Sequence, residues 1–222
     1  MISHPSTALT GFFITGTNTH IGKTYFTSLL TQHLRAQKIP ALALKPFCCG
    51  DRSDVEIFAK ANEETLSLNQ INPVHLLPPL APYAACVVEE RLLDPQDTLL
   101  SIRELAQNSP GPFLIEGCGG WLVPITKSYW IREFAQELAL PIVLVASAGL
   151  GTLNHSLLTI ENIRNSGCQI AGIVMNFHDC PEDLATATNA AILEDLTGLP
   201  VYALDPDAKK LECLPSWLIP QC

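Results

Sequence analysis

One stretch near the N-terminus has the residue types and spacing of a phosphate-binding loop. Residues 16–24 read Gly-Thr-Asn-Thr-His-Ile-Gly-Lys-Thr and lie between an apolar run and a helical pattern. In such loops, backbone N–H groups and the N-terminus of the following helix bind phosphate oxygens. Gly22 lets the backbone approach the phosphates, Lys23 reaches the β and γ oxygens, and the Thr24 hydroxyl can bind Mg²⁺. Five residues rather than the common four separate Gly16 from Gly22, but the flanking elements still predict nucleotide binding.

Two carboxylates could complete a magnesium site beside this loop. Glu116 ends an apolar run, where a carboxylate commonly lies beside the Mg²⁺ of a phosphate-loop enzyme, and Asp54 follows the second apolar run and its loop. Mg²⁺ prefers oxygen ligands and retains several waters, so Thr24, Asp54 and Glu116 would suffice to bind it. Taken alone, Asp54 also fits the first turn of a helix, where a negative charge is favourable.

A second lysine, Lys45, directly follows the apolar run 41–44 and precedes Pro46. One interpretation is the solvent-facing end of a strand, with the side-chain stem lying along apolar surface. The other is a positive charge directed at a phosphoryl group during its transfer. Under the second interpretation, Lys45 should emerge at the edge of a sheet close to the phosphate loop.

Short apolar runs that alternate with helical patterns must position these side chains. Residues 23–37 have apolar side chains at helical spacing, which predicts a helix after the phosphate loop. Near-continuous apolar runs predict parallel strands buried on both faces, and they lie at residues 11–15, 41–44, 113–115, 141–146, 171–175 and 200–204. We therefore expect a doubly wound α/β fold of the P-loop NTPase type. Its sheet should be mostly parallel with helices on both faces, in a single domain over residues 1–222.

In folds of this type, ligands bind at the carboxyl ends of the strands. The polar candidates directly follow the predicted strands, and they are the loop 16–24, Lys45, Glu116, the segment 147–154 and Asn176. The sequence therefore predicts that these residues gather at one edge of the sheet.

Composition and charge argue against several other classes of protein. The chain of 222 residues carries 13 Lys and Arg against 22 Asp and Glu, and a formal net charge of -9 disfavours nucleic acid as a partner. The longest apolar stretch, residues 138–153, is interrupted by Pro141 and two glycines, which argues against a membrane span. The N-terminus lacks the basic region of a secretory signal. No Cys-x-x-Cys pair is present, so we expect the eight cysteines to be reduced thiols of a cytoplasmic protein.

Taken together, these motifs resemble the dethiobiotin synthetase family, over most of the chain from Phe12 to about Pro206. The phosphate loop with five intervening residues matches that family's own variant, and the Glu-Gly-x-Gly-Gly-Trp run is specific to it. The matching segments are residues 15–24, Lys45-Pro46, Ser53-Asp54, residues 116–121, residues 150–155 and Asn176.

The resemblance implies a reaction of biotin biosynthesis. The family condenses 7,8-diaminononanoate with CO₂, supplied as CO₂ or bicarbonate, and consumes ATP with Mg²⁺ to give dethiobiotin, ADP and phosphate. One amine first forms a carbamate, which attacks the γ-phosphoryl group of ATP. The second amine then closes the ring of the resulting carbamic-phosphoric anhydride, in a step that becomes unimolecular when the amine is held nearby.

The resemblance also implies a role for individual residues. The catalytic residues would be Lys45, Lys23 and Thr19. The nucleotide would contact His20, Ile21, Gly22, Lys23, Thr24, Tyr25, Asp54, Glu116, Gly117, Cys118, Gly119, Asn176, Phe177, Pro206, Asp207 and Ala208. The substrate would contact Cys49, Gly151, Thr152, Leu153 and Asn154. In the family, the carboxylate of the diamine is held by a helix N-terminus of the other subunit, so the resemblance implies a homodimer with a shared active site.

Three residues depart from the family pattern. Cys49 stands where Ser or Thr usually contacts the substrate, His20 where Glu or a small residue is usual, and Phe177 where a polar residue is common. Cys49 could contact the substrate or simply fill space, and nearby Lys45 could lower its pKa and make it the cysteine most open to alkylation. The preference for ATP over CTP or another nucleotide is left open by these residues.

Other phosphate-loop proteins provide the alternatives. A partitioning-type ATPase would carry an extra lysine near the start of the loop, and residues 17–21 contain none. A cobyrinate-type synthetase would need a further glutaminase domain, for which the chain leaves no room. A non-catalytic nucleotide-binding module would not need Lys45, Asp54 and Glu116 together.

Overall fold

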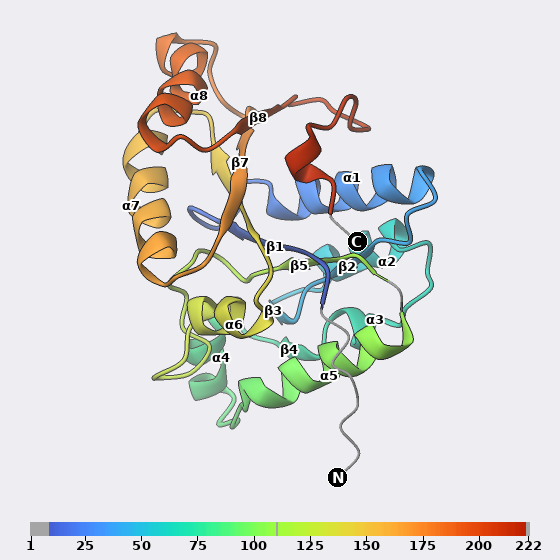
Figure 1. The fold of residues 1–222 in the computed structure, drawn as a ribbon. Helices are drawn as coiled ribbons and strands as arrows, with labels where there is room; N and C mark the ends of the chain where they lie inside the picture. Colours follow the sequence, from blue (N-terminus) through green and yellow to red (C-terminus); the bar gives the residue numbers. More distant parts are fainter. Residues whose placement is uncertain (1–8, 110, 221–222) are drawn as a thin grey trace.

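The computed structural model describes residues 9–109 and 111–220 and contains a six-stranded parallel sheet in the order β2-β5-β1-β6-β7-β8 (Figure 1). Its strands are β1 Gly11–Gly16, β2 Leu42–Leu44, β5 Phe113–Glu116, β6 Ile142–Ser147, β7 Ile170–Asn176 and β8 Val201–Leu204. A second sheet pairs β3 Phe47–Cys49 with β4 Val74–Leu76, also in parallel. The helices are α1 Lys23–Ala36, α2 Ser53–Ala61, α3 Leu68–Ile71, α4 Pro82–Val88, α5 Pro95–Asn108, α6 Ile131–Leu138, α7 Thr152–Asn165, α8 Leu184–Thr197 and the 3₁₀ turn η1 Ser216–Leu218.

The alternation of side chains along β1 explains why helices cover both faces of the sheet. Phe12 and Ile14 pack against α1 and η1, whereas Phe13 points to the opposite face and packs with α5 and α6. All three side chains are buried, as expected of a central parallel strand. The helix α7 covers the same face as α5 and α6 farther along the sheet, against β6 and β7 (Figure 1).

The small sheet is joined to the main core by aromatic packing. The ring of Phe47 on β3 meets that of Phe134 on α6 edge-on, with centroids 5.0 Å apart and an interplanar angle of 73°. Such a pair contributes roughly 0.5–1.5 kcal/mol beyond the area that it buries. This contact fixes β3 beside the carboxyl edge of the main sheet, where the candidate residues lie.

The predicted fold class is confirmed, because helices cover both faces of a parallel sheet. All six predicted strands form within one residue or two of their expected bounds, and the predicted helix 23–37 is α1. The sequence analysis missed β3 and β4. Each has only three residues, one begins directly after Pro46, and the other has His75 at its centre, so neither forms a clear apolar run.

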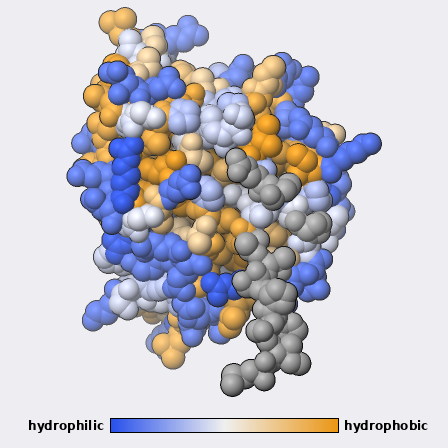
Figure 2. All heavy atoms as spheres, viewed as in Figure 1, coloured by the Kyte–Doolittle hydropathy of each residue, from blue (hydrophilic) through white to orange (hydrophobic). Residues whose placement is uncertain are grey.

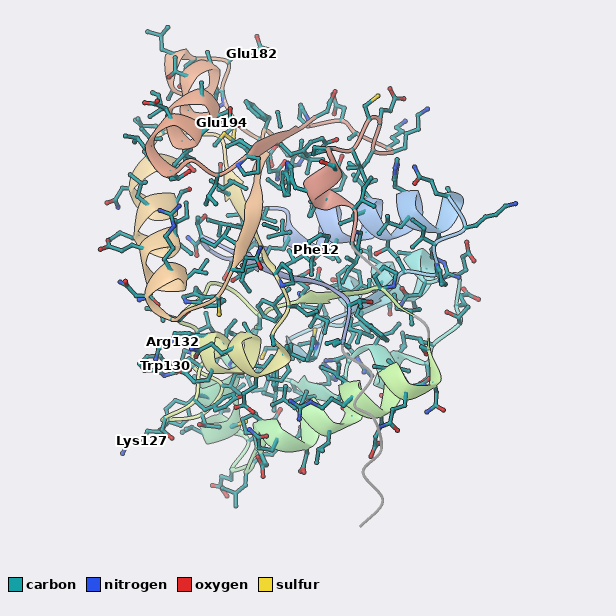
Figure 3. All side chains as sticks on the ribbon, viewed as in Figure 1. Phe12, Lys127, Trp130, Arg132, Glu182 and Glu194 are labelled. Carbon is teal, nitrogen blue, oxygen red and sulfur yellow. The ribbon has the colours of Figure 1, made fainter. Side chains whose placement is uncertain are left out.

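The surface is mixed in character. Hydrophilic and hydrophobic residues are interspersed on the face shown in Figure 2. Lys127, Glu182 and Glu194 extend outward from the molecule, while Phe12 lies within it (Figure 3). Among the described residues, the helices are either too short or too polar to cross a lipid bilayer.

Candidate active site

The phosphate loop is shaped by glycines at close contacts. Gly22 immediately precedes α1 and has a φ of +92°, a conformation that L side chains rarely adopt. A Cβ atom at Gly22 would lie 2.2 Å from Nδ2 of Asn176, and one at Gly16 would lie 2.4 Å from Cδ1 of Ile21. The loop is also fixed to the sheet, because the backbone N–H of Thr17 donates to the carbonyl of Val145 at 3.1 Å. The backbone conformation and the contact with Asn176 therefore favour glycine at position 22, whereas a side chain at position 16 would require the Ile21 side chain to move.

Asn176, at the end of β7, is hydrogen-bonded to the phosphate loop. Its Nδ2 donates to the carbonyl oxygen of Ile21 at 3.0 Å, and its Oδ1 accepts the backbone N–H of His178 at 3.1 Å. The side chain is buried, so these bonds satisfy both ends of the amide. The structure thus places Asn176 as a residue that positions the loop, while its predicted contact with the base stays a prediction.

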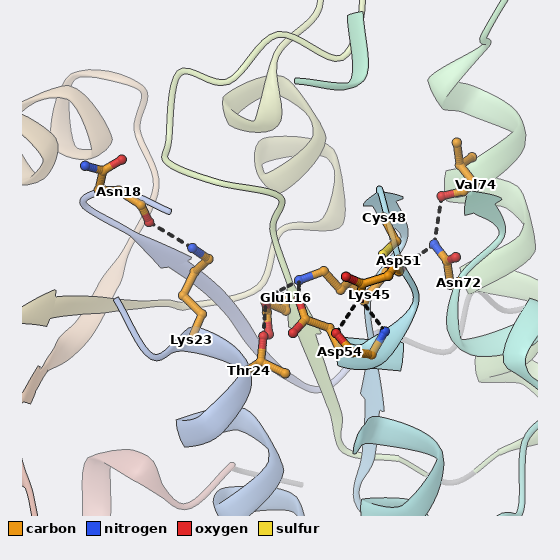
Figure 4. Close-up of polar contacts among 11 residues, drawn as sticks. Asn18, Lys23, Thr24, Lys45, Cys48, Asp51, Asp54, Asn72, Val74 and Glu116 are labelled. Carbon is orange, nitrogen blue, oxygen red and sulfur yellow. Dashed lines mark hydrogen bonds and ion pairs between the residues drawn. The ribbon is translucent and has the colours of Figure 1, made fainter. Parts of the chain in front are cut away.

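A buried lysine–carboxylate cluster faces the loop across the sheet edge (Figure 4). Nζ of Lys45 donates to Oε1 of Glu116 at 2.6 Å and to Oδ2 of Asp54 at 2.5 Å. The Thr24 hydroxyl donates to the same Glu116 oxygen at 3.1 Å, which joins the first turn of α1 to the cluster. Lys45 is only 7% exposed, so the solvent-facing interpretation of this residue is wrong.

The backbone around Lys45 is held by a buried asparagine that the sequence analysis did not single out. Nδ2 of Asn72 donates to the carbonyl oxygens of Lys45 at 2.9 Å and of Val74 at 2.7 Å, and the latter bond is drawn in Figure 4. Asn72 itself is 1% exposed, so its hydrogen bonds cannot be replaced by water. An asparagine beside a short apolar segment carries no motif, so the sequence offered no signal for this role.

The pKa values of the two lysines are shifted in opposite directions. Burial alone would lower the pKa of Lys45, but the carboxylates of Glu116 and Asp54 outweigh it and raise the pKa above its usual value. Burial lowers the pKa of Lys23, and it outweighs the opposing effect of the Glu116 carboxylate, while the positive charge of Lys45 supports it. Nζ of Lys23 donates to the carbonyl oxygen of Asn18 at 2.9 Å, within the phosphate loop. The site thus places two lysines in the lining of one cavity.

The oxygen atoms of this cluster fit a magnesium ion. Oε2 of Glu116 is buried and has no hydrogen-bond partner among the described residues. The side chain of Asp54 is 39% exposed and forms an ion pair with Lys45, and the Thr24 hydroxyl supplies a further oxygen. Two carboxylates and a hydroxyl, with waters, are the donor set that Mg²⁺ prefers. Nowhere in residues 9–109 and 111–220 do three His, Cys, Asp or Glu side chains gather as ligands of another kind of metal.

One cavity of about 820 Å³ brings many of the predicted residues together. Its lining includes Thr19, His20, Gly22, Lys23, Thr24, Tyr25, Lys45, Cys49, Asp54, Glu116, Cys118 and Gly119. Pro79, Leu80 and Ala81, which precede α4, also line this cavity, and the sequence analysis did not select them. These residues carry no functional groups, so their types gave no reason to select them.

Other predicted residues lie around the cavity rather than in its lining. Gly117 is packed tightly, because a Cβ there would lie 3.1 Å from the ring of Phe13. The Tyr25 hydroxyl donates to the carbonyl of Ala208, which ties the segment 206–208 to α1. Phe177 packs with the core of α7 and α8. The segment 151–154 begins α7, where Gly151 and Asn154 are exposed and Thr152 is buried.

Two cysteines, Cys49 and Cys118, line the cavity. The interaction with the Cys118 thiol raises the pKa of Cys49 above its usual value, and burial acts in the same direction. The interaction with Cys49 lowers the pKa of Cys118; burial opposes this shift, and the charges of Lys45 and Lys23 support it. The expected lowering of the Cys49 pKa by Lys45 is therefore wrong, because the Cys118 thiol and burial raise this pKa instead.

Fold and site together define a protein of the P-loop NTPase class. Residues 10–212 match a family model described as an AAA domain. The structure is similar to a ParA family ATPase from Chlorobium tepidum, with a TM-score of 0.54, 15% identity, and coverage of 91% of this chain and 85% of that one. It is also similar to the septum site-determining protein MinD from Pyrococcus horikoshii, with a TM-score of 0.54, 15% identity, and coverage of 88% and 81%.

Relatives found by sequence similarity define a narrower group than the structural neighbours do. An ATP-dependent dethiobiotin synthetase from Akkermansia muciniphila is 35% identical over 190 residues, which are 86% of this chain and 89% of that protein. One from Anaeromyxobacter dehalogenans is 37% identical over 200 residues, or 88% and 89% of the two chains. The chain belongs to the ATP-dependent dethiobiotin synthetase family.

Proposed function

We propose that this protein uses ATP and CO₂ or bicarbonate to carboxylate 7,8-diaminononanoate and to close the ring of dethiobiotin. The observation that carries this proposal is the single cavity in which Lys23, Thr24, Lys45 and Glu116 meet. A phosphate loop alone would suit any nucleotide-binding protein. A second, buried lysine opposite the loop suits an enzyme that must bring a negatively charged acceptor to the γ-phosphoryl group.

Electrostatic attraction is the main task of the chain in this reaction. The carbamate of the diamine and the triphosphate are both anionic, so they repel one another as they approach. Lys45 stays protonated because Glu116 and Asp54 raise its pKa, and its charge is held in place by both carboxylates. Lys23, at the start of α1, would place its charge at the β- and γ-phosphates. Two fixed cations therefore stabilise the charge that moves during phosphoryl transfer.

Thr19 would orient the reacting groups. It lies exposed in the phosphate loop and lines the cavity, so its hydroxyl can donate to the γ-phosphate or the carbamate. A Cβ at Gly119 would lie 3.5 Å from the Thr19 hydroxyl oxygen, which places the segment after β5 beside it. Holding the second amine of the diamine close to the activated carbonyl would then make ring closure an intramolecular step.

Thr24, Asp54 and Glu116 would hold Mg²⁺, with the buried Oε2 of Glu116 as an oxygen not used by other described residues. When bound, the ion supplies positive charge to the phosphate oxygens during transfer. Lys45 donates to both carboxylates, so it would keep them oriented whether or not the nucleotide is present.

The start of α7 would complete the site of a second copy of the chain. Gly151 has a φ of +93°, the helix starts at the next residue, and Asn154 is exposed rather than directed into this chain's own cavity. Exposed backbone N–H groups at a helix N-terminus can bind a carboxylate. We therefore include a homodimer with a shared active site in the proposal. The proposal also includes a single domain over residues 1–222 and a cytoplasmic location.

Release of ADP tests the proposed function. The assay contains Mg²⁺, ATP, the diamine and bicarbonate, and each component is omitted in turn. ADP should form only in the complete mixture, with dethiobiotin as the product identified by mass spectrometry. Equal rates of ADP release with and without the diamine would contradict the proposal and favour a partitioning-type ATPase.

A further inference from the structure

The outer side of β2 is bound by side chains and a helix end instead of another strand. β2 is the edge strand of the main sheet in the described part of the chain, so its outer backbone groups need other partners. Asn62, buried directly after α2, binds the N–H and the carbonyl of Ala43, at 2.7 and 3.0 Å. The N–H of Lys45 donates to the carbonyl of Ile71 at 2.9 Å, and its carbonyl accepts Nδ2 of Asn72 at 2.9 Å. Residues 71 and 72 therefore hold the backbone of Lys45 on both sides of its Cα atom.

The guanidinium group of Arg52 fixes the orientation of the Asn72 side chain. Nε of Arg52 donates to Oδ1 of Asn72 at 3.2 Å, and Nη2 donates to the backbone carbonyl of Asn72 at 3.1 Å. Nη2 also donates to the carbonyl of Leu68, and both terminal nitrogens donate to Oδ1 of Asn69. Because an amide oxygen accepts and an amide nitrogen donates, Oδ1 turned toward Arg52 leaves Nδ2 facing the carbonyl of Lys45.

Arg52 also starts the helix that carries Asp54. It directly precedes α2, its carbonyl accepts the N–H of Glu56 at 3.0 Å, and Asp54 lies in the first turn. The ion pair between Nζ of Lys45 and Oδ2 of Asp54, at 2.5 Å, completes a closed chain of contacts. Through its side chain, Arg52 therefore binds the segment that holds Lys45, and through its backbone it belongs to the helix that holds the acidic partner of this lysine.

We propose that Arg52 is a positioning residue for Lys45, which acts through its hydrogen bonds to Asn72. Arg52 lies outside the lining of the cavity, so its effect must pass through the backbone of Lys45 and through α2. A lysine cannot replace it, because one ammonium group cannot reproduce the fixed fork of a guanidinium group. The effect on the geometry of Lys45 depends only on these contacts, whereas the effect on catalysis rests on the proposed function.

A displaced Lys45 should slow the reaction without weakening the binding of ATP. Misplacement of a catalytic group by about 1 Å can lower a rate roughly 100-fold. The phosphate loop and Lys23 lie on the other side of Lys45 from Asn72 (Figure 4), so the loss of Arg52 leaves their contacts in place. We therefore expect kcat to fall and the KM for ATP to stay nearly unchanged.

Steady-state kinetics of three variants provide the first test, at a temperature at which circular dichroism shows each to be folded. We expect kcat to fall at least about tenfold in Arg52→Ala and at least about fivefold in Arg52→Lys. Asn69→Ala is the matched control, because it removes one partner of Arg52 and leaves both bonds to Asn72, and its kcat should equal that of wild type. Wild-type kcat in Arg52→Lys would assign the effect to charge alone and overturn the proposal. A kcat in Asn69→Ala as low as in Arg52→Ala would also overturn it.

Acetylation of lysines provides a second test, which needs no turnover of the diamine. The proteins without ligand are treated with a dilute acetylating reagent, digested with a protease that does not cut at lysine, and analysed by mass spectrometry. Lys45 and Lys23 are only 7% and 6% exposed, so both should react slowly in wild type. In Arg52→Ala and Arg52→Lys, acetylation of Lys45 should become faster while that of Lys23 stays slow, and Asn69→Ala should behave as wild type.

The two tests separate the possible outcomes. Faster acetylation of both lysines would indicate general loosening of the fold and would overturn the proposal, as would unchanged acetylation of Lys45. Faster acetylation of Lys45 alone, with unchanged kcat, would overturn the link between its position and catalysis. If the wild-type protein does not use the diamine, the proposed function fails, and the acetylation of Lys45 still decides whether Arg52 positions it.

Discussion

Nζ of Lys45 lies 2.6 Å from Oε1 of Glu116, and each residue directly follows the last residue pair that joins β2 to β5, Leu44 with Ile115. The register of two neighbouring strands therefore sets the ion pair, without any loop between the partners and the sheet. Breaking a buried pair by removing one partner costs about 3–5 kcal/mol, because it leaves an uncompensated charge. The site is thus part of the sheet's own structure.

Replacing Lys45 should reduce catalysis far more than nucleotide binding. The Lys45→Ala variant loses the charge opposite the phosphate loop, and removal of such a preorganised group lowers kcat roughly 10²–10³-fold. Steady-state kinetics and the Kd for Mg-ATP are measured on protein whose folding has been checked by urea unfolding. The exposed Lys60 of α2 provides the control, because Lys60→Ala removes a lysine outside the cavity. Loss of ATP binding with unchanged kcat would contradict the role given to Lys45.

Replacing Glu116 should change the magnesium requirement. The Glu116→Gln variant keeps the size of the side chain but removes the charge that faces Thr24 and Lys45. We expect the Mg²⁺ concentration for half-maximal activity to rise, and the measurement is ADP release at fixed ATP over a series of Mg²⁺ concentrations. An unchanged dependence on Mg²⁺ would remove Glu116 from the proposed ligand set.

Adding a methyl group at Gly22 should disrupt ATP binding through the loop. The new Cβ would lie 2.2 Å from Nδ2 of Asn176 at a φ of +92°. Gly198 also has a positive φ, of +66°, but no atom lies within 4 Å of its Cβ position. Gly198→Ala should therefore cost about 1–2 kcal/mol of stability from strain alone and leave the KM for ATP unchanged. Equal KM values for ATP in both variants would refute a specific role of the Gly22–Asn176 contact.

A shared active site should allow complementation between two inactive subunits. We expect Asn154→Ala to raise the KM for the diamine and to leave ATP affinity nearly unchanged. Unfolding and refolding a mixture of Asn154→Ala and Lys45→Ala chains produces heterodimers in which one site has both native residues. Activity at low diamine concentration should then exceed that of either variant alone. A mixture no more active than its components would show that Asn154 does not serve a partner's site.

The Cys48 thiol should make the protein less stable at alkaline pH. Burial raises the pKa of Cys48 from 9.0 to about 11. Between these pH values the folded state binds more protons than the unfolded state, so the free energy of unfolding falls as the pH rises. Urea unfolding over this range should show a steeper decline for wild type than for Cys48→Ala. Parallel declines would mean that ionisation of this thiol is not linked to folding.

The sequence was sufficient for the main sheet and for the phosphate loop because both depend on local patterns. Apolar runs mark strands that are buried on both faces, and the glycines around residues 16–24 have one physical explanation, a close approach of the backbone. Lys45 and Glu116 were also found, because each directly follows such a run. Their contact is a consequence of strand pairing, which a doubly wound fold makes predictable.

The features that the sequence did not predict depend on contacts between segments far apart in the chain. Asn72 holds the backbone of Lys45 across 27 positions of the chain, and nothing in its neighbours indicates that its amide is buried. Cys49 and Cys118 likewise line one cavity only because the fold brings β3 and the segment after β5 together. Short strands such as β3 and β4 form because the surrounding core supports them, so their sequences alone are ambiguous.

The central position of β1 also determines when the phosphate loop can take its shape during synthesis. β1 is the first strand of the chain, but its neighbours β5 and β6 are made much later. The loop itself is held by Val145 on β6 and by Asn176 at the end of β7, which is made later still. Such non-local pairings form slowly, because the intervening chain must first be brought together. A nascent chain therefore carries its nucleotide motif from the start, yet cannot gain stability from ATP until nearly the whole sheet has left the ribosome.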